Sequence, residues 1–160
     1  MDKNEKYIDL EFAKLDIDRF KRRGASEAVF CECKTNEQLE TIFTAFKNNN
    51  SNIIGTRACI EQFEFLKNKF NNLEYNEAAR VITLIQNPVE KVGEIAICTG
   101  GTGDIPVAEE ARAVAEFFGS NTKKYYDIGV AGIHRLLSNI DEIKKANVII
   151  VVAGMEGALG

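Results

Sequence analysis

Hydrophobic and polar positions follow two different periods along this chain. Near the N-terminus, Ile8, Phe12 and Leu15 stand at helical spacing within a charged stretch. Because apolar side chains at this period share one face of a helix, the sequence predicts a helix over residues 3–22. The short apolar run at 28–31 has the length and composition of a strand.

The next helix has the strongest local signal. Thr35 and Gln38 have the spacing of a capping box, in which each side chain bonds to the backbone of the other residue. The apolar positions after it fall at i, i+3, i+4 and i+7 and are Leu39, Ile42, Phe43 and Phe46. We therefore expect a helix that begins after Thr35 and ends at the asparagine run 48–50.

Further apolar runs continue an alternation of strands and helices in the first half. Strands are expected at 53–54, 73–75 and 80–85. A helix between the first two of them carries the apolar residues Phe63, Leu66 and Phe70. This alternation favours an α/β layer.

A polar segment at 86–91, which contains Pro88, marks a change of composition. We place a domain boundary there, with an N-terminal α/β domain at 1–88 and a second domain at 89–160. Strands are expected in the second domain at 95–98, 125–128 and 148–152, and helices at 107–118 and 138–145. Short β-branched strands separated by helices are typical of a parallel sheet that helices cover on both faces.

The loops that follow these three strands are the expected functional region. In open parallel sheets, ligands bind in the crevice at the carboxyl ends of the strands. The loops at 99–104, 129–135 and 154–160 hold the most unusual residues of the chain. We expect them to converge on one site.

Composition and charge narrow the class of protein. Lys and Arg number 20 and Asp and Glu number 24, so the formal net charge is −4 and a nucleic-acid partner is not expected. The longest apolar run, Val148 to Ala153, is far below the roughly 20 residues that span a bilayer, and the N-terminus lacks a signal peptide's apolar region. We therefore expect no membrane partner and a cytoplasmic location.

Cysteine and histidine content limits the chemistry. Four cysteines without paired C-x-x-C spacing indicate reduced thiols rather than a disulfide framework or a zinc ribbon. The single histidine, His134, excludes multi-histidine metal centres. The groups left to carry out the chemistry of this protein are carboxylates, backbone amides, Arg, Lys, Cys and His134 itself.

A glycine-rich turn opens the first helix of the second domain. Its backbone amides and the positive end of the helix dipole suit a phosphate or a carboxylate. Gly100, Gly101 and Gly103 could equally make only a tight turn, since the loop is neither a Walker A loop nor a dinucleotide fingerprint. Asp104 could hold a ribose or a catalytic proton, although its spacing favours a capping role.

Three other positions have both a functional and a structural interpretation. His134 with Arg135 could supply an acid or base beside a fixed cation, or be an ordinary pair at a helix start. Glu156, between glycines after a buried strand, could be partly desolvated with a raised pKa, or be a solvated loop residue. Arg57 could reach a ligand from the first domain, or seal the interface between the domains.

Three blocks of the second domain resemble one family, in the same order. They are TGGTGDIPVAEEA at 99–111, DIGVAGIHRLL at 127–137 and VVAGMEGAL at 151–159. They resemble LarB, the pyridinium-3,5-biscarboxylic acid mononucleotide synthases that make the nickel-pincer cofactor of lactate racemase. The first domain resembles the N-terminal region of that family at Leu15-Asp16, Arg19, Arg23-Gly24, 34–38, 56–58 and 75–80.

The second domain also resembles the PurE-type carboxylases and mutases that act on aminoimidazole ribonucleotide in purine synthesis. Together the two resemblances imply a fold: a small N-terminal α/β region followed by the first part of a PurE-like, flavodoxin-like parallel sheet with helices on both faces.

The LarB resemblance implies a reaction. Nicotinic acid adenine dinucleotide is carboxylated on its pyridinium ring with carbon dioxide or bicarbonate, and its phosphoanhydride is hydrolysed to release AMP. Magnesium is the expected cofactor, without a ligand set in the sequence. A homo-oligomer is the expected assembly, and it could be a PurE-like octamer.

The resemblance also implies site residues. We expect Glu156 and Asp104 to transfer protons or activate water, and His134 and Arg135 to place a carboxyl or phosphate group. The expected substrate-binding residues are Thr99, Gly100, Gly101, Thr102, Gly103, Arg135, Gly154, Gly157 and Arg57.

The family pattern continues past Leu159 with proline, where this chain has Gly160. The family's nucleophilic cysteine lies further on, so we carry no nucleophile over to Cys98 and expect these residues alone to be an inactive part of the enzyme. The alternatives are a purine-pathway carboxylase or mutase and a noncatalytic nucleotide-binding module.

Overall fold

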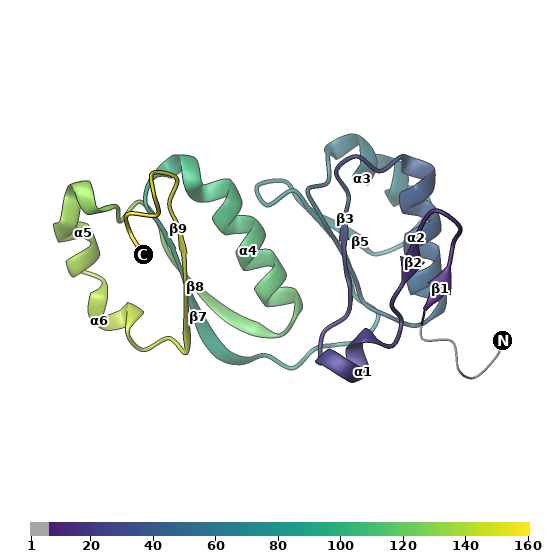
Figure 1. Cartoon of the computed structure of the whole chain (residues 1–160), viewed down its shortest axis with the longest axis horizontal. Helices are drawn as coiled ribbons and strands as arrows, with labels where there is room; N and C mark the ends of the chain where they lie inside the picture. The colour runs from purple at the N-terminus through teal and green to yellow at the C-terminus, as the bar shows by residue number, and fades with distance from the viewer. Residues whose placement is uncertain (1–6) are drawn as a thin grey trace. The chain divides into compact units, whose positions relative to one another are not determined.

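The computed structural model describes residues 7–160 (Figure 1). The chain divides into two compact units, the first ending at Pro88 and the second running from Val89 to Gly160. Each unit has its own sheet and its own cluster of buried apolar side chains.

The first unit contains a four-stranded mixed sheet in the order β3-β4-β6-β5. The strands are β3 (Ala28–Phe30), β4 (Ile53–Thr56), β5 (Leu73–Asn76) and β6 (Val81–Leu84). Strand β3 is parallel to β4, whereas β6 is antiparallel to both β4 and β5. Helices α2 (Asn36–Asn48) and α3 (Ile60–Lys67) pack on one face of this sheet (Figure 1).

The capping box at the start of α2 is confirmed. Thr35 Oγ1 accepts a hydrogen bond from the Gln38 amide at 3.2 Å, and Gln38 Oε1 accepts one from the Thr35 amide at 3.0 Å. The four apolar residues of the expected face are all buried. The capping box and the buried apolar face therefore both place α2 where the sequence predicted it.

The expected N-terminal helix at 3–22 is wrong for the described residues, and its residues 3–6 lie outside them. A hairpin of β1 (Ile8–Asp9) and β2 (Lys14–Leu15) precedes a short α1 (Arg19–Arg23). Glu11 has a φ of 69°, and its amide donates to Asp9 Oδ1, which makes the turn. Ile8 and Leu10 before the turn, and Ala13 and Leu15 after it, pack against the core at a period of two, and Phe12 in the turn is exposed.

The helix expected around Phe63 and Leu66 is confirmed as α3, but it ends before Phe70. Phe70 is buried just beyond the helix, next to a turn in which Asn72 has a φ of 62°. Strand β6 begins at Val81 rather than at Arg80, whose own φ of 53° does not fit a strand.

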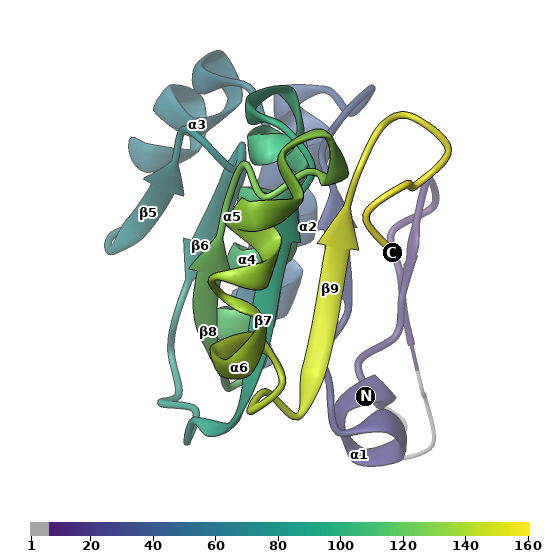
Figure 2. The same ribbon diagram turned by 90° about the vertical axis from the view of Figure 1, so that its left-hand side faces the viewer.

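The second unit contains a three-stranded parallel sheet in the order β8-β7-β9. The central strand is β7 (Val92–Thr99), flanked by β8 (Ser120–Tyr125) and β9 (Val148–Val152). Helix α4 (Ile105–Phe117) covers one face, and the short helices α5 (Ile133–Leu137) and α6 (Ile140–Ile143) cover the other (Figures 1 and 2). This is the expected flavodoxin-like arrangement, with the first strand in the middle.

Strand β8 lies earlier in the chain than expected. The apolar run at 125–128 was the predicted strand, but the sheet contains residues 120–125, most of which are polar. An edge strand needs no continuous apolar run, because one side of it meets solvent. Asp127, with a φ of 57°, turns the chain away from the sheet.

The helix expected at 138–145 is shortened to α6 (Ile140–Ile143). His134 and Arg135, expected in a loop, lie in α5, and the helical turn resumes only in α6. Ser138 Oγ and Asn139 Nδ2 both donate to the carbonyl of Arg135, at 2.9 and 2.8 Å. Polar side chains that bond to the nearby backbone in this way compete with the helix.

Strand β9 is apolar in sequence but half exposed in this unit. Val148, Ile149 and Val151 are 51%, 47% and 37% exposed. β-branched runs of this kind are ordinarily buried on both faces of a parallel sheet. Strand β9 therefore presents an apolar edge at the end of the sheet.

Candidate active site

Asp104 fixes the conformation of the loop after β7. The Gly101 amide donates to Asp104 Oδ2 at 2.8 Å, and the Gly100 amide donates to the carbonyl of Val152 in β9 at 2.9 Å. A short 3-10 turn, Thr102–Asp104, then leads directly into α4. The Asp104 carboxylate thus closes the glycine turn, and its side chain makes no cap hydrogen bond to α4, although Asp104 is the N-cap residue of that helix.

The three loops converge at the carboxyl end of the sheet. A Cβ placed on Gly129 would lie 2.3 Å from the carbonyl oxygen of Gly100, and one on Gly100 would lie 3.3 Å from the Cβ of Ala153. A Cβ on Gly154 would lie 3.6 Å from Asp104 Oδ1. Glycine is needed at position 129 because any side chain would collide with the backbone of the first loop.

Thr99 lies beneath these loops. It is fully buried at the end of the central strand, where its Oγ1 accepts a hydrogen bond from the Asp127 amide at 2.8 Å. Its carbonyl accepts another from the Ile128 amide at 3.0 Å. Thr99 therefore fixes the start of the second loop, whereas Thr102 and Gly103 are exposed.

Arg135 and His134 point to different surroundings, as consecutive helical residues do. Arg135 forms an ion pair with Asp127, with 2.6 Å between one terminal nitrogen and Oδ2. His134 is exposed, and its carbonyl accepts the Ser138 amide within the helix. Asp127 was not among the expected site residues, although it stands at the start of a matching block.

Glu156 is exposed, so the interpretation that it is partly desolvated is wrong. It has a φ of 41° and is followed by Gly157 with a φ of 68°, which gives two successive left-handed residues. The Ala158 amide donates to the carbonyl of Met155 across this turn at 3.0 Å. The side chain is presented to solvent beside Gly154.

Arg57 belongs to the first unit. It follows β4 with a φ of 55°, and its carbonyl accepts a hydrogen bond from Arg80 at 3.3 Å. The neighbouring carbonyl of Ala58 accepts from Tyr75 and Arg80 at 3.1 and 3.3 Å. Arg57 thus lies in a tightly bonded turn.

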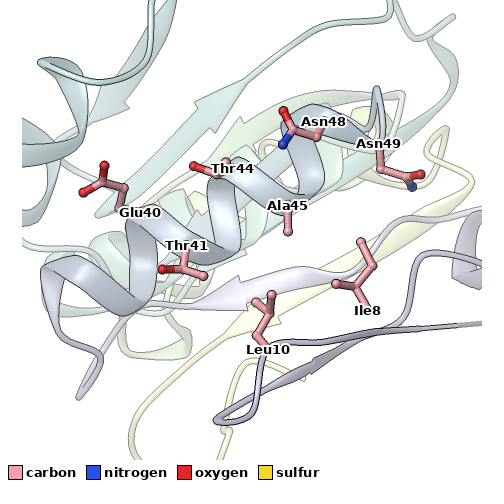
Figure 3. A pocket seen from close by; sticks show the side chains of 8 residues that line it. All are labelled: Ile8, Leu10, Glu40, Thr41, Thr44, Ala45, Asn48 and Asn49. Carbon is pink, nitrogen blue, oxygen red and sulfur yellow. The ribbon is translucent and has the colours of Figure 1, made fainter. Parts of the chain in front are cut away.

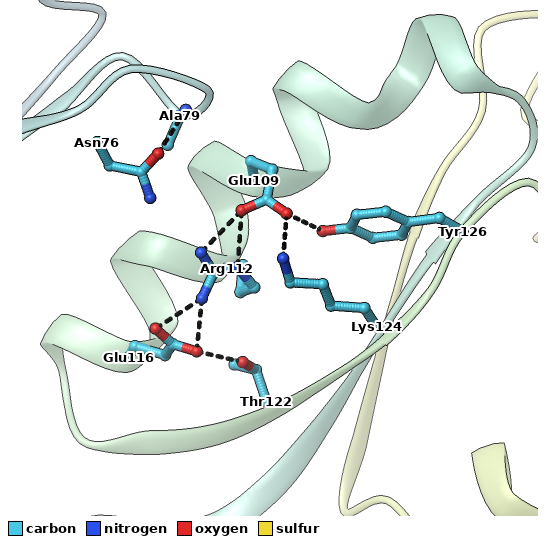
Figure 4. A network of polar contacts seen from close by, with 8 residues as sticks. All are labelled: Asn76, Ala79, Glu109, Arg112, Glu116, Thr122, Lys124 and Tyr126. Atoms are coloured by element: carbon cyan, nitrogen blue, oxygen red, sulfur yellow. Dashed lines mark hydrogen bonds and ion pairs between the residues drawn. The ribbon is translucent and has the colours of Figure 1, made fainter.

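Sequence patterning missed an ionic network between α4 and β8, centred on the buried Glu109 (Figure 4). Glu109 is 5% exposed, and its Oε1 accepts from Lys124 at 2.7 Å and from Tyr126 at 2.9 Å. Its Oε2 accepts from Arg112 at 2.8 Å, and Arg112 also reaches Glu116. The only local signal is the spacing of Glu109, Arg112 and Glu116 on one helical face.

This network shifts several pKa values. Burial acts to raise the pKa of Glu109, but the hydrogen bonds from Lys124, Arg112 and Tyr126 outweigh it and hold that pKa below its usual value. Burial and the bond to Glu109 raise the pKa of Tyr126 to about 12. Tyr126 directly precedes Asp127, so the network anchors the strand end from which the second loop starts.

Two cysteines are buried, one in each unit. Cys31 is fully buried in the first, where burial raises its thiol pKa to about 12. Cys98 is buried in β7, and burial raises its pKa as well. A protonated, enclosed thiol is a poor nucleophile, which agrees with assigning no nucleophilic role to Cys98.

The described residues hold no cluster of metal-ligating side chains. Within residues 7–160, no three His, Cys, Asp or Glu side chains gather as a ligand set. Mg²⁺ is commonly bound by one or two carboxylates together with waters and substrate phosphates, so magnesium stays a prediction. In the same range, no helix is long and apolar enough to cross a membrane.

A surface groove of about 530 Å³ lies in the first unit (Figure 3). Ile8 and Leu10 of the hairpin form one wall, and the other wall is α2 and its end, with Glu40, Thr41, Thr44, Ala45, Asn48 and Asn49. None of the expected site residues lines this groove.

The second unit is an open α/β domain in which the loops after the parallel strands meet at one end of the sheet. Residues 7–87 match the family model described as the LarB/PurE-like N-terminal domain. Uncharacterized protein MJ0165 of Methanocaldococcus jannaschii is 38% identical over an alignment 178 positions long, gaps included. The alignment covers 99% of this chain and 68% of that protein. The chain belongs to the LarB/PurE-like family, which is related to carboxylases.

Proposed function

We propose that this protein takes part in the carboxylation of nicotinic acid adenine dinucleotide and in the cleavage of its phosphoanhydride, as in nickel-pincer cofactor synthesis. The observation that carries the proposal is the convergence of three glycine-rich loops at one end of the parallel sheet, with Asp104 and Glu156 on them and Arg135 in α5, which follows the second loop. The family membership supports a carboxylase-type enzyme.

The proposed chemistry has two steps. In the first, a new bond joins the carbon of CO₂ to the second meta carbon of the pyridinium ring, and that carbon loses its proton to a base. In the second, water attacks phosphorus, the phosphoanhydride bond breaks, and AMP leaves with the biscarboxylic mononucleotide as the other product. An electron-poor ring attacks CO₂ only after a nucleophile has added to it, and that nucleophile leaves again once the ring carbon has lost its proton, which restores the pyridinium. The buried Cys98 is unsuited to that task.

The roles follow from position. Arg135 binds a carboxylate or phosphate of the dinucleotide, and the loop at 100–103, at the N-terminal end of α4, binds a phosphate. Exposed Glu156 takes or delivers a proton, while Asp104 braces the glycine turn and offers Oδ1 towards the third loop. His134 stays a candidate for placing the carboxyl group.

The test is an assay with labelled bicarbonate. The purified protein and the longer M. jannaschii relative are each incubated with nicotinic acid adenine dinucleotide and labelled bicarbonate, with magnesium or with a chelator. Mass spectrometry should find a labelled biscarboxylic mononucleotide and AMP with the relative, and calorimetry should find dinucleotide binding by this chain. Folded proteins that neither bind nor convert the dinucleotide would refute the proposal.

A further inference from the structure

Under the proposed function, Arg135 binds an anionic group of the ligand. In the structure, its side chain already forms an ion pair with an acidic residue. One of its terminal nitrogens lies 2.6 Å from Asp127 Oδ2. A Cβ on Gly132 would lie 2.7 Å from Arg135 Nε, so the guanidinium also lies directly against the Gly132 backbone. The cation is therefore fixed from two sides.

Asp127 is itself rigidly placed. Its amide donates to the Oγ1 of Thr99 at 2.8 Å, and the next amide, of Ile128, donates to the Thr99 carbonyl at 3.0 Å. Thr99 is fully buried at the end of the central strand, and Ile128 is buried too. Asp127 also has a left-handed φ of 57°, which Asp adopts more readily than most residues, so its placement rests on the two hydrogen bonds to Thr99.

We infer that Asp127 is a positioning residue that orients the Arg135 guanidinium towards the anionic group of the ligand. The bond to Asp127 uses one of the five N–H donors of the guanidinium and sets the plane of the others. This inference rests on the proposed function, because it assumes that Arg135 binds an anion.

The ion pair serves orientation more than folding. The Arg135 and Asp127 side chains are 38% and 47% exposed, and pairs so accessible to solvent contribute little to stability. Variants at Asp127 should therefore fold, and effects on ligand binding can be measured directly.

The experiment is calorimetric titration of the protein with nicotinic acid adenine dinucleotide and with AMP. Asp127→Ala should weaken binding about tenfold, as expected when one charge-assisted contact loses its orientation. Asp127→Asn should restore most of the affinity, because its amide oxygen can accept the same N–H. Glu142→Ala removes a carboxylate from the exposed pair with Lys145 elsewhere in the unit and should leave binding unchanged.

A double-mutant cycle separates positioning from a general effect. Arg135→Ala should weaken dinucleotide binding, and adding Asp127→Ala to that variant should weaken binding no further. Wild-type affinity in Asp127→Ala, or full additivity in the double variant, would overturn the inference. So would binding that does not depend on Arg135.

The outcomes distinguish the inference from the proposed function. If the labelled-bicarbonate assay gives no product while binding depends on both Arg135 and Asp127, the reaction is refuted and the positioning role stands. If product forms and binding depends on Arg135 alone, the positioning role is refuted and the reaction stands.

Discussion

Gly129 lies so close to Gly100 that a Cβ on Gly129 would approach the Gly100 carbonyl oxygen to 2.3 Å. Two loops that are separated by a whole helix and strand in sequence thus share backbone contact. The arrangement of the loops at the end of the sheet depends on this close approach, because it sets the spacing of the first and second loops.

Gly129→Ala should therefore push the two loops apart. Overpacking against backbone costs about 2 kcal/mol, and we expect a loss of that size in the unfolding free energy of the second unit, together with weaker dinucleotide binding. Chemical denaturation and calorimetry measure the two effects. Gly103→Ala is the matched control, because a Cβ there meets no atom within 4 Å, and it should change stability by less than about 0.5 kcal/mol. Equal losses of stability in the two variants would contradict the prediction.

The Glu109 carboxylate should make stability depend on pH. Its pKa is lowered in the folded state from an ordinary value of 4.5, so its contribution is present above that value and is lost as pH falls through the lower folded pKa. Glu109→Gln should lower stability near neutral pH by about 2 kcal/mol, as expected for hydrogen bonds to a charged group.

Denaturant unfolding at a series of pH values from neutral to acidic checks this prediction. The difference between wild type and Glu109→Gln should shrink as the pH falls below the ordinary range of a glutamate. Asp141→Asn, at an exposed position in the same unit, should follow the wild-type curve. A difference that stays constant with pH would show that the charge of Glu109 is not the cause.

The capping box of α2 should contribute measurably to the first unit. Thr35→Ala removes the acceptor of the Gln38 amide and should lower the unfolding free energy by about 1 kcal/mol. Thr41→Ala, in the exposed middle of the same helix, should leave stability unchanged or slightly higher, since alanine favours helix. Thermal and denaturant unfolding compare the two variants, and a neutral Thr35→Ala would count against the cap.

The apolar edge formed by β9 should promote self-association. Ile149→Lys places a charge on the exposed side of that strand and should shift the protein towards monomer as measured by sedimentation velocity at rising concentration. Ile85→Lys replaces a similarly exposed isoleucine in the first unit and should have no such effect. A wild-type protein that stays monomeric at high concentration would refute the expectation of a homo-oligomer.

Elements could be predicted from the sequence where a local motif or a continuous apolar run agrees with the way the element packs in the fold. Helix α2 has both a cap at Thr35 and an apolar face, and β9 is a continuous β-branched run. The hairpin at 8–15 was not predictable, since three apolar residues fit a helical period by coincidence while a left-handed Glu11 makes the turn. The predicted position of β8 was wrong because a polar edge strand has no apolar run to mark it.

The position of the candidate site was easier to predict than its members. The carboxyl ends of parallel strands meet at one edge whatever their side chains, so the three loops could be brought together on topology alone. The roles of Asp127 and Glu109 depend on partners 8 and 15 to 17 residues away, at Arg135, Lys124 and Tyr126. Such pairings arise only when strand and helix pack, and a local pattern does not contain them.

The buried thiols of Cys31 and Cys98 give each unit an internal reporter of its own opening. Both are enclosed, whereas Cys33 is exposed, so a thiol reagent reaches Cys31 or Cys98 only when the surrounding unit opens. Pulsed alkylation followed by peptide mass analysis would time the two openings separately within one molecule. Ligand bound at the loops after β7 should slow labelling of Cys98 and leave that of Cys31 unaltered, which would map the binding event onto one half of the chain without any engineered probe.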